Sequence, residues 1–250
     1  ATFFVEGSRA AQHPELVRRI RAEVHEIGVQ TFTHVDLATV PQWRARLELS
    51  LTQVTVAGAA DMVAPLVRLP YSSTNADVDD DAWRAIQHAG RQGHVTVLST
   101  LDSDDLRRPG VAQIVARSTP PDDAGQILLM HDGGGDRSQT VAALRQLLPT
   151  FQGQGIGVDT VSGAVGLTTN TASASTADHW QGRALLVSLR VSDLAIGMLG
   201  WLLLIAGALT VVRAAIVLVA ARRHHRRRRR KRWGPPVTTP VSIIVPAFNE

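Results

Sequence analysis

Polar side chains that could carry out chemistry follow the apolar runs of this sequence at four places. They are Gln30 with His34, the segment Arg68 to Tyr71, the segment Asp102 to Asp105, and His131 with Asp132. Imidazole and carboxylate groups exchange protons and bind cations, whereas a guanidinium binds anions. These residue types suit proton transfer and ion binding, provided that the fold brings the four places together.

Short apolar runs that alternate with amphipathic stretches predict how these groups are positioned. The expected strands are 1–5, 29–33, 64–69, 94–100, 126–130 and 156–161, and the expected helices are 14–28, 41–56, 79–92, 109–117 and 137–152. Strands that alternate with helices form parallel sheets or barrels, whose chemistry lies at the carboxyl ends of the strands. The pattern therefore predicts an α/β domain with the four polar places on one rim.

A long apolar run near the end of the chain predicts a membrane span. Residues 194–212 contain no charge, and residues 222–232 contain nine Lys or Arg. About 20 apolar residues cross a bilayer, and Lys- and Arg-rich loops stay on the cytoplasmic side. We therefore expect a transmembrane helix over 194–221, with residues 1–193 extracellular and residues 222–250 cytoplasmic. The alternative is a buried core helix followed by a nucleic-acid-binding arm, but buried helices are rarely this long.

The charge distribution indicates which partners to expect. The formal net charge is +4, although the basic run alone carries +9, so the rest of the chain is net acidic. A single basic segment beside a span predicts binding to anionic membrane lipid and no nucleic-acid partner. The chain has no cysteine, which rules out a disulfide framework. Residues 162–182 are rich in Ser, Thr, Ala and Gly, so we expect a flexible linker and juxtamembrane segment over 168–193.

Five motifs in a fixed order give the sequence a family resemblance. They are ATFFVEG at 1–7, HEIGVQTFTHVDL at 25–37, RLPY at 68–71, LDSDDL with RRPGV at 101–111, and LLMHDGGGDRS at 128–138. Over residues 1–167 the chain resembles the NodB-homology polysaccharide deacetylases of carbohydrate esterase family 4. The resemblance implies a distorted (β/α) barrel that here lacks its first strand. It also implies deacetylation of N-acetylated polysaccharide with a divalent metal, usually zinc.

The resemblance assigns metal ligands to this sequence. Family members hold the metal with one Asp and two His, and His34 matches the second His. Gln30 stands where the first His is usual, and a neutral amide is a poorer zinc ligand than an imidazole. The family's motif with the metal Asp and the base Asp precedes the strand expected at 1–5. We therefore expect the chain to be a fragment of a longer protein, with a weakened metal site.

The resemblance also assigns catalytic roles to four further residues. It implies that His131 is the general acid and that Asp105 orients it. Arg68 would hold the base, and the backbone N–H of Tyr71 would face the oxyanion. Leu106 replaces the Trp that usually walls the site.

The last ten residues carry a second resemblance. Residues 241–250, VSIIVPAFNE, resemble the opening strand of glycosyltransferase family 2, so 222–240 is expected to be a polybasic cytoplasmic connector. A nucleotide sugar would then bind only to the missing C-terminal domain. The whole predicts a membrane-anchored deacetylase fused to a cytoplasmic glycosyltransferase. Two alternatives stay open: a catalytically degenerate sugar-binding module, and a plain anchoring or assembly segment for the transferase.

Overall fold

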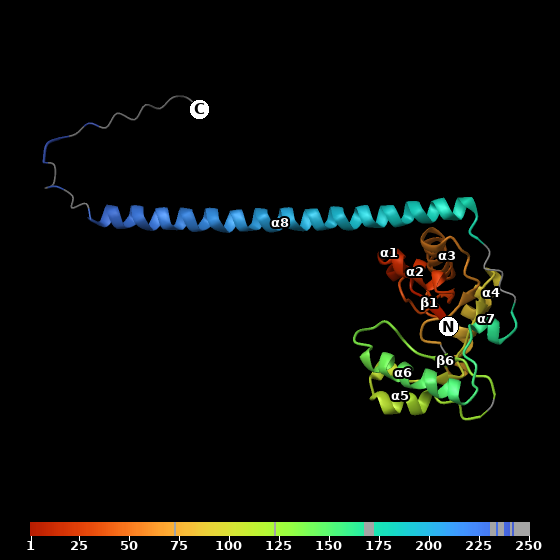
Figure 1. Ribbon diagram of the computed structural model, residues 1–250. Coiled ribbons are helices and arrows are strands. Elements are labelled where there is room, and N and C mark those ends of the chain that lie inside the picture. Colours follow the sequence, from red (N-terminus) through yellow and green to blue (C-terminus); the bar gives the residue numbers. More distant parts are fainter. Residues whose placement is uncertain are drawn as a thin grey trace. The chain divides into compact units, whose positions relative to one another are not determined.

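The computed structural model describes residues 1–72, 74–122, 124–167, 173–230, 234, 238–240 and 242. The chain divides into two units, residues 1–192 and 193–250 (Figure 1). The first unit contains all the described strands and the candidate site residues. The second contains most of one long helix.

Parallel strands build the first unit. One sheet has the order β1 (Thr2–Val5), β2 (Glu26–Val29), β3 (Leu66–Val67) and β4 (Val95–Thr96), and a second pairs β5 (Leu101–Asp102) with β6 (Leu128–Leu129). Every pair is parallel. The predicted α/β class is confirmed, whereas closure into a barrel stays a prediction.

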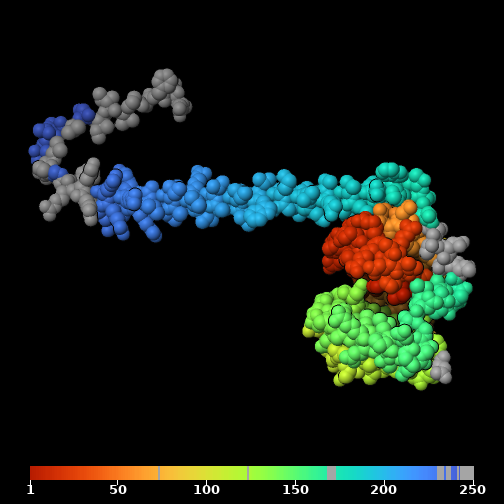
Figure 2. Space-filling model, in the orientation of Figure 1, coloured from red at the N-terminus to blue at the C-terminus, as the bar shows by residue number. Residues whose placement is uncertain are grey.

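Helices connect and cover these strands (Figure 1). They are α1 (Gly7–Gln12), α2 (Pro14–Ala22), α3 (Gln42–Ala60), α4 (Asp80–Arg91), α5 (Val111–Ser118), α6 (Ser138–Gly153) and α7 (Val161–Ala164), with single 3-10 turns η1 (Asn75–Asp77) and η2 (Asp105–Arg107). Helix α3 packs on α1 and α2, and α5 packs on α6, as the space-filling view also shows (Figure 2). The core between helices and sheet includes Ile27, Val29, Leu49, Val56 and Val67, each at most 1% exposed. Burying such a side chain stabilises the fold by about 1.5–3 kcal/mol.

Two of the predicted strands are wrong. The second strand is Glu26–Val29, not 29–33, because α2 ends at Ala22 and Val24 then takes the left-handed conformation with φ 62°. The run expected as a strand over 156–161 is irregular and leads into α7. The earlier start of β2 places Gln30 directly after its last residue, so Gln30 and His34 belong to a loop at the carboxyl end of the sheet.

The segment expected to be a flexible linker is largely helical. Residues 168–172 lie outside the described residues, and α8 (Thr176–Arg230) starts soon after them. Within the first unit, the early turns of α8 cross α3 at Gly58 and Gly182, where a Cβ on either glycine would meet the backbone of the other helix. His179 Nδ1 also lies 3.1 Å from Asp61 Oδ1 at the end of α3. The first turns of α8 are therefore docked on the domain.

The rest of α8 has the properties of a membrane span. Its most apolar 18-residue window has a mean hydropathy of 2.6, and none of that window is buried. By length and composition this is the one helix among the described residues that could cross a bilayer. The expected span 194–221 lies inside it. The glycosyltransferase-like residues 241–250 lie outside the described residues, apart from Ser242.

The glycine crossing leads to a paired prediction. Gly→Ala in a helix normally stabilises it by about 0.5–1 kcal/mol, because glycine loses more backbone entropy on folding. Gly90 in α4 has no heavy atom within 4 Å of an added Cβ, so Gly90→Ala should raise the melting temperature. Gly58→Ala should lower it, because the Cβ meets the backbone at Gly182 and overpacking costs about 1–3 kcal/mol. Thermal melts of both variants in detergent micelles would check the opposite signs, and two stabilised variants would contradict the close crossing.

Candidate active site

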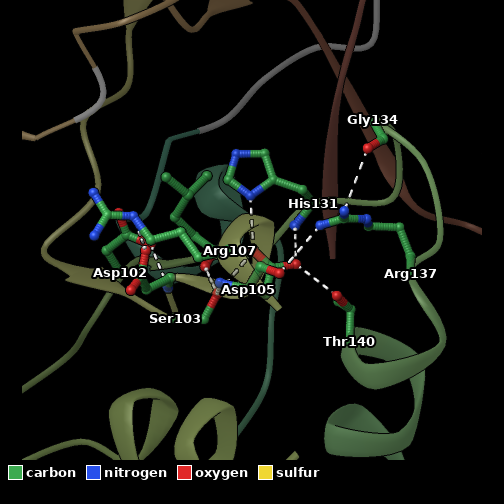
Figure 3. Close-up of polar contacts among 10 residues, drawn as sticks. Asp102, Ser103, Asp105, Arg107, His131, Gly134, Arg137 and Thr140 are labelled. Carbon is green, nitrogen blue, oxygen red and sulfur yellow. Dashed lines mark hydrogen bonds and ion pairs between the residues drawn. The ribbon is translucent and has the colours of Figure 1, made fainter. Parts of the chain in front are cut away.

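A fully buried carboxylate, Asp105, forms the centre of one half of the site. It is 0% exposed and begins η2, shortly after strand β5. Its Oδ1 lies 2.8 Å from His131 Nδ1 and accepts a hydrogen bond of 3.1 Å from the Ser103 hydroxyl. Its Oδ2 accepts from the His131 backbone N–H at 3.0 Å and from the Thr140 hydroxyl at 2.7 Å (Figure 3). Both carboxylate oxygens therefore have two partners.

These partners keep Asp105 ionised. Burial by itself raises the pKa of the Asp105 carboxyl, but the hydrogen bonds from His131 and Thr140 outweigh it and lower the pKa to about 2. An ionised carboxylate only accepts hydrogen bonds, so Nδ1 of His131 carries a proton. The other ring nitrogen of His131, Nε2, is then the one that can exchange a proton with a substrate. The His131 side chain is 31% exposed, which leaves it reachable.

The strand register explains why these two residues meet. Asp102 on β5 pairs with Leu129 on β6, and both chains continue past the same edge of the sheet. The Ser103 hydroxyl shares its one proton between Asp105 Oδ1 and the Leu129 carbonyl, 2.8 Å away, and so links the two strand ends. Arg137 then donates to the Asp105 and Gly134 carbonyls at 3.1 and 3.3 Å, which holds the loop after His131 (Figure 3). The His131–Asp105 pairing expected from the sequence is therefore present, with a rigid frame around it.

Gln30 and His34 form a second polar group, in the loop after β2. Their side-chain nitrogens lie 3.2 Å apart, Gln30 Nε2 to His34 Nε2. The turn between them is held by Glu48 of α3, a carboxylate whose side chain is 7% exposed. Glu48 accepts hydrogen bonds of 2.8 Å from both the backbone N–H and the hydroxyl of Thr33. This buried anchor fixes His34, whose φ of 58° is unusual for a residue with a side chain.

Arg68 and Tyr71 lie just after the next strand, β3. The Tyr71 ring meets the His34 ring edge to face, with centroids 5.3 Å apart, and is itself 68% exposed. Tyr71 also has a positive φ of 64°, so its turn is conformationally strained. Arg68 is only 5% exposed and lies over the Phe4 ring, 5.0 Å from guanidinium carbon to centroid. The ends of β2 and β3 therefore bring His34, Tyr71 and Arg68 to one edge of the sheet.

The buried guanidinium of Arg68 lacks an anion. Its Nε and Nη1 are buried and have no hydrogen-bond partner among the described residues. Burial lowers its pKa to about 10, which the charge of Asp102 opposes, so it remains a cation at neutral pH. A buried cation without a partner is costly, by several kcal/mol in ordinary cases. The site is therefore suited to a carboxylate placed against Arg68, as the family resemblance implies.

The residues present do not fit a divalent metal centre. No group of three or more His, Cys, Asp or Glu that could hold a metal ion occurs in the part of the chain that the structure describes. His34 offers one imidazole, and its neighbour Gln30 offers a neutral amide. Zinc sites in proteins use at least three protein ligands, drawn from Cys, His, Asp and Glu. We therefore assign no step to a metal ion here.

Some contributors to the site carry no signal in the sequence. Thr140, Ser103, Arg137 and Glu48 each hold a site residue or its loop through a hydrogen bond. Thr140 is 35 residues from Asp105, and Thr33 is 15 residues from Glu48. A helical Thr and a helical Glu are common on any amphipathic helix. Only the folded arrangement distinguishes them from solvent-facing neighbours.

Comparison with known proteins places this geometry among carbohydrate-modifying enzymes. A family model described as polysaccharide deacetylase matches residues 1–93. A peptidoglycan-N-acetylglucosamine deacetylase from Bacillus cereus is 35% identical over 164 residues, which cover 65% of this chain and 73% of that protein. A chitooligosaccharide deacetylase from a Bradyrhizobium strain is 34% identical over 167 residues, covering 62% of this chain and 73% of that protein.

A solved structure shares the fold. It is a CE4 family pseudoenzyme from Bacillus anthracis, 23% identical, with a TM-score of 0.58. The alignment covers 66% of this chain and 55% of that one, so this chain spans little more than half of its length. At this identity the likeness concerns the fold alone.

Removing the Thr140 hydroxyl should change how the free energy of unfolding depends on pH in the acid range. A carboxyl whose pKa is lower in the folded state adds stability above its unfolded value of 3.8, and this stability is lost as the pH falls toward about 2. Thr140→Ala should therefore destabilise the domain at neutral pH by about 1.5–3 kcal/mol, the usual contribution of a hydrogen bond to a charged group. It should also lose less stability than the native protein between about pH 4 and about pH 2.

Thr150→Ala on the same helix is the matched control. The Thr150 hydroxyl bonds only to the Gln146 carbonyl of its own helix, 2.8 Å away, and is exposed. Denaturant melts across the acid range should leave this control close to the native profile. A Thr140→Ala profile parallel to the native one would contradict the role assigned to the hydroxyl.

Proposed function

Because the chain belongs to the polysaccharide deacetylase family, we propose that it removes acetyl groups from an N-acetylated polysaccharide. The observation that carries this proposal is the His131–Asp105 pair, with its ring nitrogen 2.8 Å from a buried, ionised carboxylate. A buried carboxylate that accepts from one imidazole nitrogen orients the other nitrogen for proton transfer.

The reaction places a specific demand on His131. Hydrolysis of an N-acetyl group adds water to the carbonyl carbon, breaks the C–N bond and yields acetate and an amine. An amine leaves poorly unless its nitrogen is protonated as the bond breaks. Protonated at Nε2, His131 donates that proton, while Asp105 stabilises the imidazolium and fixes its orientation. The buried Thr140 and Ser103 contacts hold Asp105 for this task.

Arg68 and Tyr71 complete the proposed site at the neighbouring strand end. The unpartnered guanidinium of Arg68 suits a carboxylate that takes a proton from the attacking water. The backbone N–H of Tyr71 is proposed to face the oxyanion that forms on the acetyl oxygen. The exposed Tyr71 ring offers an apolar face to a sugar ring. These roles follow the family motifs and the placement of both residues after β3.

His131→Ala should abolish most acetate release from N-acetylglucosamine oligomers. General acid catalysis contributes about 10²–10⁴-fold, so we expect a loss of that order in kcat. His13→Ala is the control, since His13 is exposed and contacts only Glu15, 3.3 Å away. The assay measures acetate released by the full-length protein. Equal rates for native protein and His131→Ala would refute the role of His131.

A second candidate function is sugar binding without turnover. It is favoured by one observation, the contact of Gln30 with His34 at 3.2 Å, where the family has two histidines. In this case the native protein would bind N-acetylglucosamine oligomers but release no more acetate than His131→Ala. Measuring binding and release on one preparation separates the two functions.

The membrane setting is a further part of the proposal. The long exposed apolar helix, followed by exposed basic residues at 222–229, supports anchoring through α8. We place the deacetylase domain outside the cell, with the basic segment against anionic lipid headgroups on the cytoplasmic side. The substrate is then a cell-surface polysaccharide. The resemblance of residues 241–250 supports a cytoplasmic glycosyltransferase after the span, which alone would bind a nucleotide sugar.

Cysteine labelling can test this topology, because the chain contains no native cysteine that would react beside the introduced one. Ser188→Cys lies before the apolar run and should react with a membrane-impermeant maleimide added to intact cells. Gly234→Cys lies after the basic run and should react only once the cells are permeabilised. The reverse pattern would invert the orientation, and labelling of both sites in intact cells would exclude a single span.

A further inference from the structure

The contact between Gln30 and His34 has two possible chemical meanings. A separation of 3.2 Å between Gln30 Nε2 and His34 Nε2 is that of a hydrogen bond. It also matches two ligands on one tetrahedral zinc ion, which lie about 3.3 Å apart when each bond is about 2.0–2.1 Å. The spacing of the two nitrogens therefore fits either a hydrogen bond or a pair of metal ligands. The chemical nature of the two facing atoms decides between these alternatives.

The atoms that face each other favour the hydrogen bond. An amide nitrogen has donor hydrogens and no lone pair available for coordination, so it donates to the imidazole nitrogen of His34. That nitrogen is the only imidazole lone pair this loop could offer a cation. Rotating the amide would present its oxygen, which is neutral and belongs to a class that suits magnesium and calcium better than zinc. In either orientation of the amide, Gln30 gives a zinc ion no strong ligand.

The surroundings prevent His34 from moving away to free its nitrogen. The almost fully buried carboxylate of Glu48 accepts two hydrogen bonds of 2.8 Å from Thr33, the residue before His34. The Tyr71 ring lies against the other side of the imidazole, with centroids 5.3 Å apart. The loop is therefore held in place, and the side chain at position 30 determines which partner His34 Nε2 meets.

We infer that Gln30 keeps His34 from binding a cation, and that the single change Gln30→His gives a cation two imidazoles in place of one. The native protein binds no zinc ion at His34, because the Gln30 amide occupies the coordinating nitrogen. This deepens the proposed function, on which it rests for the assignment of position 30. It adds to the proposed function that hydrolysis by the native domain proceeds without a zinc ion at His34.

The test is zinc affinity, measured separately from acetate release. Metal-free full-length protein in detergent micelles is titrated with zinc against a chromophoric chelator. The native protein should show no stoichiometric binding that His34→Ala removes. Gln30→His should gain more than about 100-fold in affinity, since even residues that only support a ligand change metal affinity 10–100-fold. Adding His34→Ala to Gln30→His should remove the gain.

Gln152→His is the matched control, because it adds one imidazole at an exposed position on α6, away from the site. It should leave zinc affinity at the native value. The inference is overturned if the native protein binds one zinc ion through His34, or if Gln30→His binds no better than Gln152→His. If Gln30→His binds zinc as expected and the native protein releases no more acetate than His131→Ala, the inference stands and the proposed deacetylation fails. If the native protein binds zinc through His34 and releases acetate, the inference fails and the proposed deacetylation stands.

Discussion

A buried charge needs hydrogen-bond donors in place of water, and in this domain the buried charge is the carboxylate of Asp105. Its carboxylate is fully buried, so every lone pair left without a donor would cost free energy. The donors come from the end of β5, the loop after β6 and helix α6, which are far apart in the sequence. Satisfying one carboxylate therefore fixes three elements at once. The orientation of His131 follows from the same bonds.

The two halves of the site are built by different physical means. Strand register creates the His131 half, because neighbouring parallel strands end at the same edge and carry their next residues together. A helix supports the other half, where Glu48 of α3 accepts two hydrogen bonds from Thr33 in the loop after β2. The first half has a complete set of partners. The second has an amide beside an imidazole, and a buried guanidinium with two nitrogens that have no partner among the described residues.

The sequence predicted the class of the fold and two of the polar side-chain contacts more accurately than the element boundaries. Motif order placed His131 with Asp105 and His34 with Gln30, and both contacts exist. The strand at 26–29 was missed because an apolar run after a helix fits either structure, and only the turn at Val24 separates them. The supporting side chains Thr140 and Glu48 could not be found, since each acts across a long sequence separation through one hydrogen bond.

The glycine crossing between α3 and α8 limits how freely this domain can be recombined. Two helices that touch backbone to backbone leave no room for a larger side chain on either surface, so neither Gly58 nor Gly182 can be enlarged without moving a helix. The same constraint applies to protein engineering. A chimera that joins this domain to a foreign anchor would need a small residue at the crossing, in the correct register relative to α3. The domain and the first turns of α8 therefore have to be exchanged together.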